Sequence, residues 1–243
     1  MSKHLKRLLA PRFWGLRRKE TKFAVKPRPG PHPARYSIPL QVVVRDILKI
    51  AENGREAKKI IKQRAVLVDG KARTDFKYPA GLMDVIEIPT LGAAYRVVPT
   101  KKGLGLLEID KDEAKKKLCR IEKKAGLRGG EVQISTHDGR SLRFGKGDAK
   151  KYKECNEYKL GDSLLIELPS QKIIEHLRMD RGSLAVITQG RKVGKSVKIV
   201  EIMPARARGA SMAVCQLDKE KIEVSKAHMF VVGRAKPSIK LGE

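Results

Sequence analysis

Two short amphipathic helices are predicted between residues 39 and 64. Apolar side chains recur there three to four positions apart, which is the period of a helix that buries one face. We expect the first helix to end at Gly54 and the second to begin at Arg55. The apolar positions are Val43, Val44, Ile47, Leu48, Ile50 and Ala51 in the first helix and Ala57, Ile60 and Ile61 in the second.

A β-hairpin is predicted directly after the second helix. The apolar run 65–68 leads into the pair Asp69-Gly70. An Asp-Gly pair between short strands is a strong hairpin signal, because a type I′ turn needs positive φ at both central residues. A further strand is expected at residues 85–88, after Gly81.

The rest of the chain is predicted as short strands with one helix. Residues 110–124 are highly charged and carry apolar residues along one side, so we expect a helix there. Short strands separated by Gly and Asp turns over residues 131–168 predict a small β-barrel or sandwich. Two strands around a basic, glycine-containing loop are expected over residues 182–202, and a last strand at 229–233.

Charge narrows the possible partners of this α+β chain. Its 243 residues include 54 Lys and Arg but 27 Asp and Glu, which gives a net charge of +27 and a pI near 10.2. A compact fold with that excess repels itself and needs a polyanion, which is nucleic acid, an anionic membrane surface or an acidic protein. A membrane is the weaker candidate, because no apolar run approaches the roughly 20 residues that span a bilayer. The N-terminus also lacks the features of a signal peptide, so we expect a cytoplasmic protein.

Residues 1–40 predict an extended basic arm. Prolines alternate between residues 27 and 33, which excludes helix, and the first 35 residues carry a net charge of +10. Phe13, Trp14 and Phe23 lie among the cations. Aromatic rings can stack on RNA bases while cations contact phosphates, but such rings can equally pack the arm onto the protein's own core. We expect the arm to be disordered alone and to order on binding.

Enzymatic or metal chemistry has little support in the sequence. Cys119, Cys155 and Cys215 lie far apart without a CxxC pair, so we expect buried, unreactive thiols. The five histidines are scattered, and His137-Asp138-Gly139 predicts a β-turn, because no nucleophile or second acid accompanies it. We therefore expect no catalytic residues, no cofactor and no metal.

Two segments resemble known modules. The helix pair, the stretch Q-R-A-V-L-V-D-G-K-A-R-T-D at 63–75 and Y-P-A-G-L-M-D-V-I-E-I at 78–88 resemble the alpha-L RNA-binding motif. In that motif, the helices and hairpin form one positive face against structured RNA. Members usually have Asn where this chain has Asp69, an acceptable turn residue. Residues 182–202 resemble the KOW motif, a pair of strands around a basic glycine loop.

The order of the modules resembles one family, the archaeal and eukaryotic small-subunit ribosomal protein four of the "e" type. The stretches that match it most closely are K-H-L-K-R at 3–7, G-P-H at 30–32, T-H-D-G-R at 136–140 and F-V-V-G at 230–233. The chain ends soon after the last of these, and its KOW loop differs from the eukaryotic pattern, so we expect an archaeal-type member. The resemblance implies a structural, non-enzymatic constituent of the small ribosomal subunit. Its partners would be small-subunit ribosomal RNA and neighbouring ribosomal proteins, with no membrane and no small-molecule substrate.

The expected architecture is a multi-module α+β chain. It comprises a basic Pro-rich arm at 1–40, an alpha-L RNA-binding motif at 41–100, a central small β-barrel domain at 101–172, a KOW-type (SH3-like) β unit at 173–215, and a C-terminal strand with a basic tail at 216–243. The predicted RNA-binding residues are Lys3, Lys6, Arg7, Arg12, Arg17, Arg18, Lys19, Arg28, Arg55, Lys58, Lys59, Lys62, Arg64, Lys71, Arg73, Arg191, Lys192 and Lys195.

Two other functions stay open at this point. Alpha-L motifs also occur on RNA-modifying enzymes, but such an enzyme would need a catalytic domain for which these modules leave no space. A KOW-type transcription factor that binds polymerase is the other alternative. The long basic arm and the resemblance along the whole chain favour the ribosomal protein over both.

Overall fold

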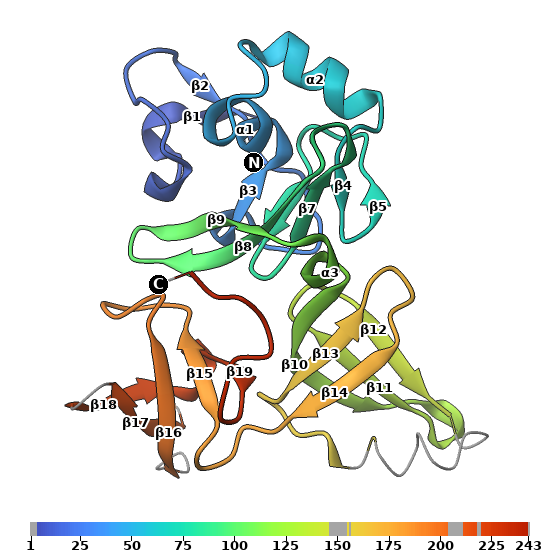
Figure 1. Ribbon diagram of the computed structural model, residues 1–243, viewed down its shortest axis with the longest axis vertical. Helices are drawn as coiled ribbons and strands as arrows, with labels where there is room; N and C mark the ends of the chain where they lie inside the picture. The colour runs from blue at the N-terminus through green and yellow to red at the C-terminus, as the bar shows by residue number, and fades with distance from the viewer. Residues whose placement is uncertain (1–3, 146–154, 156, 204–210, 218–219, 243) are drawn as a thin grey trace. The chain divides into compact units, whose positions relative to one another are not determined.

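The computed structural model describes residues 4–145, 155, 157–203, 211–217 and 220–242. The chain divides into two compact units, one up to Lys117 and the other from Leu118 onward. The fold is α+β, with several small sheets and few helices (Figure 1). Within the described residues, every helix is too short or too polar to cross a lipid bilayer.

The first unit begins with the arm. Its described residues form short strands and turns, whereas the sequence predicts an extended segment. Strands β1 (Leu5–Lys6) and β2 (Phe23–Ala24) pair antiparallel, and two 3-10 turns, η1 (Arg7–Leu9) and η2 (Arg12–Trp14), lie between them. Trp14 is 1% exposed, and its indole Nε1 donates a hydrogen bond to the carbonyl of Ser37 at 2.9 Å. For Trp14, the structure therefore supports packing of the ring onto the protein's own core.

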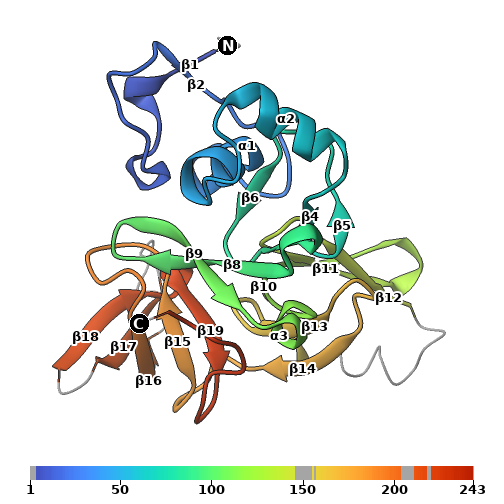
Figure 2. The same cartoon turned by 45° about the horizontal axis from the view of Figure 1, so that its top comes forward.

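The helix pair follows the short turn η3 (Ala34–Tyr36) and strand β3 (Ser37–Pro39), which pairs with β6 (Pro79–Gly81). Helix α1 (Leu40–Val42) continues as one π-helical turn, η4 (Val43–Ile47), and α2 spans Gly54–Lys62 beside it (Figure 2). The prediction that Gly54 ends the first helix is wrong. The first helix ends earlier, where Lys49 adopts φ +53°, and Gly54 is the first residue of α2.

A five-stranded sheet in the order β5-β4-β7-β8-β9 completes the first unit. Its strands are β4 (Leu67–Val68), β5 (Lys71–Ala72), β7 (Val85–Ile88), β8 (Ala93–Thr100) and β9 (Gly103–Ile109), with the 3-10 turn η5 (Pro89–Leu91) between β7 and β8. The β4–β5 hairpin and the strand at 85–88 confirm the predictions. The core between sheet, helices and arm includes Trp14, Ile38, Leu40, Val43, Val44, Ile61, Val66, Ile86 and Val97.

The predicted helix at 110–124 is wrong. Only α3 (Lys111–Ala114) is helical, and the chain then forms the long strand β10 (Lys116–Gly126). Lys117, Cys119 and Ile121 are buried at every second position on one face of the strand, and Leu118 between them is buried as well. A lysine in the first of these positions looked like a solvent-facing residue and hid that alternation.

The second unit contains two further five-stranded sheets. The first, in the order β12-β11-β10-β13-β14, adds β11 (Val132–Thr136), β12 (Ser141–Phe144), β13 (Ser163–Glu167) and β14 (Ile173–Leu177) to β10, and the 3-10 turn η6 (Arg128–Gly130) joins β10 to β11. Its core includes Cys119, Ile121, Ile134, Phe144, Tyr158, Leu164 and Ile166.

The second sheet of this unit has the order β18-β17-β16-β15-β19. Its strands are β15 (Leu184–Ile187), β16 (Ser196–Met203), β17 (Met212–Leu217), β18 (Glu220–Ser225) and β19 (Met229–Gly233), with the 3-10 turn η7 (Lys226–His228) before the last. The predicted strands around the basic loop are confirmed. The last strand, expected in a separate C-terminal segment, pairs with β15 in the same sheet.

Candidate RNA-binding surface

Helix α2 presents its cations on one face because of how it begins and what it buries. The Asn53 side chain caps the helix by accepting hydrogen bonds from the backbone N–H groups of Arg55 at 2.9 Å and Glu56 at 3.0 Å. Ala57 and Ile61 are fully buried on the inner face. The outer face, at spacings of three and four residues, consists of Arg55, Lys58, Lys59 and Lys62.

The cations of this face differ in exposure. Arg55, Lys59 and Lys62 are exposed, whereas Lys58 is half-buried with its Nζ 4.5 Å from the centroid of the Phe76 ring. A cation over an aromatic face is attracted by the ring quadrupole. Lys58 is thereby held beside Phe76, and its three neighbours are free to extend into solvent.

The hairpin after α2 carries three more of the predicted residues. Arg64 is exposed and ends α2 with φ +62°, a conformation that usually selects glycine. Lys71 is exposed after the turn formed by Asp69 at φ +53° and Gly70 at φ +71°, as a type I′ turn requires. Arg73 is half-buried, with its guanidinium 4.5 Å from the centroid of the Tyr78 ring.

A buried network of charged side chains, formed by Lys117, Asp69 and Asp84, packs beneath the turn of this hairpin. Lys117 Nζ lies 2.6 Å from a carboxylate oxygen of Asp69 and 2.6 Å from one of Asp84, and all three side chains are at most 8% exposed. The other oxygens accept backbone hydrogen bonds, Asp69 from Val85 N–H at 3.1 Å and Asp84 from Gly81 N–H at 2.8 Å. The network therefore fixes the Asp-Gly turn to strand β7.

His32 completes the network on the side of Asp84. Its Nε2 lies 3.1 Å from Asp84 Oδ1, and a Cβ added at Gly81 would meet the imidazole at 2.2 Å, so only glycine leaves room for this contact. Burial by itself raises the pKa of Asp84, but the charge of Lys117 and the contact with His32 outweigh it and hold that pKa well below its usual range. The same interior raises the pKa of Tyr78 to about 12, through burial and then the carboxylate of Asp84.

The sequence alone does not mark Lys117, Asp84 or His32 as important. The signals in the sequence are G-P-H at 30–32 and the spacing from Gly81 to Asp84. They could not be interpreted because these residues meet only after folding.

In the arm, one predicted RNA contact, Arg7, is buried. Arg7 is 6% exposed, and its guanidinium donates to Glu20 at 2.9 Å, Thr21 at 2.8 Å and the Arg17 carbonyl at 2.5 Å. These hydrogen bonds join segments of the arm and leave little of the guanidinium exposed.

The other predicted cations of the described arm are exposed: Lys6, Arg12, Arg17, Arg18, Lys19 and Arg28. Arg17 is 87% exposed although it pairs with Glu20 at 3.3 Å, and Arg28 is 65% exposed although it pairs with Asp75 at 3.1 Å. Exposed pairs of this kind are weak and exchange readily for other partners. Lys3 lies outside the described residues.

The basic loop between β15 and β16 belongs to the second unit. Arg191 and Lys195 are exposed, while Lys192 is half-buried and pairs with Glu220 at 2.9 Å. That ion pair lowers the pKa of Glu220, first through the hydrogen bond and then through the charge. The loop thus offers two exposed cations and one that is already paired.

His137-Asp138-Gly139 forms the predicted β-turn. Gly139 has φ +75°, and its N–H donates to the carbonyl of Thr136 at 3.0 Å. Asp138, His137 and Cys119 have their ligand atoms within 4.8 Å of one another, a spacing that a metal can use. However, Asp138 accepts hydrogen bonds from the Thr136 hydroxyl at 2.5 Å and from Arg140 Nε at 2.7 Å. A carboxylate bound in this way stabilises the turn.

The three cysteines are buried and unpaired with each other, as the sequence predicts. Burial raises the pKa of Cys215 to about 11 and also raises the pKa of Cys155. Both thiols therefore stay protonated and unreactive at neutral pH.

A helix pair and hairpin with a cationic outer face, on a chain of net charge +27, define an RNA-binding protein built from several small modules. The family models agree: one described as an S4 domain matches residues 38–86, one described as the RS4NT (NUC023) domain matches 1–35, and one described as ribosomal family S4e matches 91–173. The chain belongs to the S4e family of ribosomal proteins.

Relatives along the whole chain support that assignment. Small ribosomal subunit protein eS4 of Staphylothermus marinus is 46% identical, over 99% of this chain and 96% of its own length. The protein of the same name from Methanocaldococcus jannaschii is also 46% identical, over 98% and 97%. The crystal structure of 30S ribosomal protein S4e from Thermoplasma acidophilum superimposes with a TM-score of 0.68 at 32% identity and covers 82% of this chain and 96% of its own. The prediction of an archaeal-type member is confirmed.

Proposed function

We propose that this protein is a structural constituent of the small ribosomal subunit that binds and stabilises ribosomal RNA. The single observation that carries the proposal is the outer face of α2, where Arg55, Lys59 and Lys62 project from an S4 domain into solvent. Relatives at more than 40% identity, matched over nearly their whole length, are named as ribosomal proteins. The protein acts in the cytoplasm as part of the ribosome, with ribosomal RNA and neighbouring ribosomal proteins as partners, and it is not an enzyme.

The RNA contacts we propose are cations of three segments, and those that the structure describes are exposed or partly exposed. They are Lys3, Lys6, Arg12, Arg17, Arg18, Lys19 and Arg28 in the arm, Arg55, Lys58, Lys59, Lys62, Arg64, Lys71 and Arg73 in the helix pair and hairpin, and Arg191, Lys192 and Lys195 in the loop. Such contacts neutralise phosphates and release counterions. They recognise the shape of the folded RNA more than its base sequence.

We also propose a functional division of the modules. Residues 1–40 are the arm and 41–100 the alpha-L motif, supported by the position of the S4 domain match. Residues 101–172 are a small β-barrel domain, supported by the antiparallel sheet of β10–β13, whose edge strand β14 continues to Leu177. Residues 173–215 form a KOW-type unit, supported by the β15–loop–β16 hairpin, and 216–243 are the closing segment, which adds β18 and β19 to the same sheet.

Filter binding to purified small-subunit RNA tests the proposal. Reversing two charges with Lys59→Glu and Lys62→Glu should weaken binding strongly, because these exposed side chains would face phosphates. The matched control is Lys101→Glu with Lys102→Glu, which makes the same charge change at two exposed positions of the β8–β9 turn. Equal effects of the two double variants would show that only overall charge matters, and unchanged affinity in the first would refute the assigned face.

The alternatives are separated by co-sedimentation on sucrose gradients. The tagged protein should travel with small subunits. Recovery with free polymerase would support a transcription factor, and a covalent change in RNA on incubation with the protein would support a modifying enzyme.

A further inference from the structure

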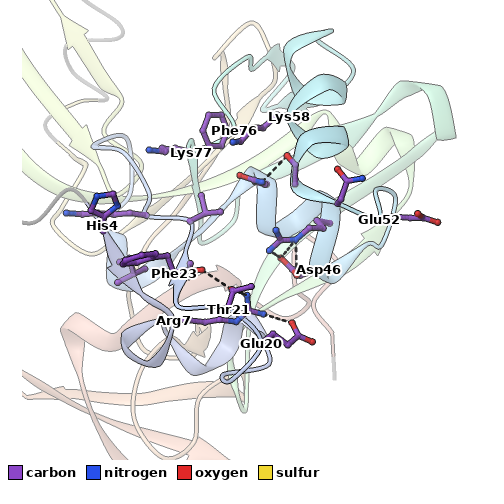
Figure 3. Close-up of a pocket in the computed structure, with 18 residues that line it drawn as sticks. His4, Arg7, Glu20, Thr21, Phe23, Asp46, Glu52, Lys58, Phe76 and Lys77 are labelled. Atoms are coloured by element: carbon purple, nitrogen blue, oxygen red, sulfur yellow. Dashed lines mark hydrogen bonds and ion pairs between the residues drawn. The ribbon is translucent and has the colours of Figure 1, made fainter.

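A groove in the first unit lies between the arm and the helix pair. It has a volume of about 670 Å³, within the usual range of ligand clefts. One wall comes from β1 and β2, the other from α1–η4 and the start of α2, and a third side from the segment after β5 (Figure 3). All of its lining residues belong to the first unit.

Aromatic rings gather in this groove. Phe23 is 46% exposed although it is large and apolar, and its ring centroid lies 5.2 Å from that of His4. Phe76 is half-buried on the other side. The pairing of Lys6 with Phe23 between β1 and β2 holds the backbone of Phe23 in place. A half-exposed ring on a fixed strand offers a flat face to another flat group.

Cations surround the rings on one side. Lys58 and Lys77 lie 4.5 and 5.5 Å from the Phe76 centroid, and Lys22 lies 5.6 Å from that of Phe23. In Figure 3, Lys77, Phe76 and Lys58 follow one another along one rim. This rim suits a negatively charged group next to a ring.

The acids of the groove lie away from that rim. Glu20 is on the opposite side, where it pairs with Arg7 at 2.9 Å. Asp46 pairs with Arg45 at 2.8 Å, so its charge is neutralised as well. Glu52, toward the other end of the groove in Figure 3, leaves that end unfavourable for a phosphate. Since Arg7 and Arg45 are paired with these acids, Lys58 and Lys77 set the charge of the rim beside the rings.

We propose that this groove holds one unpaired nucleotide of a folded RNA. Its base stacks on Phe23 beside His4, and its phosphate lies at the rim formed by Lys58 and Lys77. Stacking on an aromatic ring and a nearby cation are the contacts by which proteins bind unstacked bases. The inference rests on the proposed RNA-binding function and adds to it a site for a single unpaired base.

The test compares two RNA duplexes in binding to the full-length protein. They have identical stems, and one carries a single bulged 4-thiouridine. The wild type should bind the bulged duplex at least 10-fold more tightly than the paired one, since stacking of one base contributes on the order of 10-fold or more. On irradiation, the bulged base should crosslink to the segment around Phe23. Phe23→Ala should abolish both the preference and the crosslink, and Phe23→Trp should restore the preference.

Tyr36→Ala is the matched control, because Tyr36 is an aromatic residue of the same unit, 50% exposed and outside the groove. It should leave the preference unchanged. Equal binding of both duplexes by the wild type, or a crosslink elsewhere, would overturn the inference while the proposed function stands. Failure to bind either duplex or ribosomal RNA would overturn the proposed function itself. Displacement of the bulged duplex by an acidic peptide, but not by the paired duplex, would indicate a protein partner for the groove instead.

Discussion

The ammonium group of Lys117 lies 2.6 Å from the carboxylate of Asp84, although the two residues are 33 positions apart and both are buried. Lys117 also reaches Asp69 in the Asp-Gly turn, so one side chain joins the end of the first unit to the β4–β5 turn and to the segment just before β7. Removing one member of such a group leaves charges buried without compensation.

Lys117→Met should therefore destabilise the protein by about 3–5 kcal/mol. Urea unfolding followed by circular dichroism measures the change in the free energy of unfolding. Lys116→Met is the control, because Lys116 is exposed one residue earlier in the same strand and should cost little. Similar losses in both variants would show that the buried network contributes nothing beyond the strand itself.

Acid should lower the free energy of unfolding of the protein, because Asp84 becomes protonated. Its folded-state pKa is held below the unfolded value of about 3.9 by Lys117 and His32 against the effect of burial. A carboxylate with a lowered pKa stabilises the fold above its unfolded pKa and loses that contribution as the pH falls through the folded one. The free energy of unfolding should fall steadily below about pH 4.

Asp84→Asn separates the contribution of Asp84 from that of other acids. One of these is Asp162, whose pKa is also lowered, because hydrogen bonds from His176 and the backbone outweigh the effect of burial. The variant should be less stable at neutral pH and should lose less stability between pH 4 and pH 2 than the wild type. Parallel pH profiles for the two proteins would contradict the assignment.

Arg7 should stabilise the arm rather than contact RNA. Arg7→Met removes hydrogen bonds to Glu20, Thr21 and the Arg17 carbonyl. Limited proteolysis should then cleave the arm faster, while the remainder of the first unit stays resistant. Arg12→Met, at an exposed position of the same arm, should leave the cleavage rate unchanged but weaken RNA binding. If Arg7→Met weakened RNA binding without speeding cleavage of the arm, Arg7 would be an RNA contact.

Arg64→Gly should raise stability and lower RNA affinity together. The left-handed conformation of Arg64 costs an ordinary residue roughly 1–2 kcal/mol, which glycine avoids. Thermal unfolding and filter binding measure the two effects on the same variant. Lys49→Gly, at another left-handed position, should stabilise to a similar degree without the loss of affinity. A fall in stability at both positions would show that the strain is not relieved.

RNA affinity should depend steeply on salt. If six to ten phosphates are neutralised, the binding constant should fall about 10³- to 10⁵-fold between 50 and 200 mM salt. Lys59→Gln with Lys62→Gln should reduce the slope by about one phosphate per lysine. An unchanged slope would show that neither lysine contacts a phosphate.

Local chemistry made some elements predictable from the sequence. The Asp69-Gly70 turn follows from the two residues that form it, and α2 follows from the spacing of Ala57, Ile60 and Ile61. The exposed face of α2 follows in turn, because its cations lie opposite those buried positions. Information of this kind lies within a few residues of the element itself.

Other features depend on partners that are distant in the sequence. Arg7 and Lys117 look like surface cations until Glu20, Asp69 and Asp84 are placed beside them. The error at residues 110–124 has the same origin, since the strand alternation there includes a buried lysine. The groove could not be predicted either, because it needs the arm and the helix pair to be placed against each other.

Trp14 gives the arm a built-in spectroscopic reporter. It is the only tryptophan in the chain, and its ring is buried in the core with its N–H bonded to Ser37. Its fluorescence should be shifted to the blue while the arm is docked and to the red when it is released. The fluorescence of Trp14 thus shows, without any attached dye, whether the arm is already docked in the free protein or becomes ordered only during assembly with the ribosome.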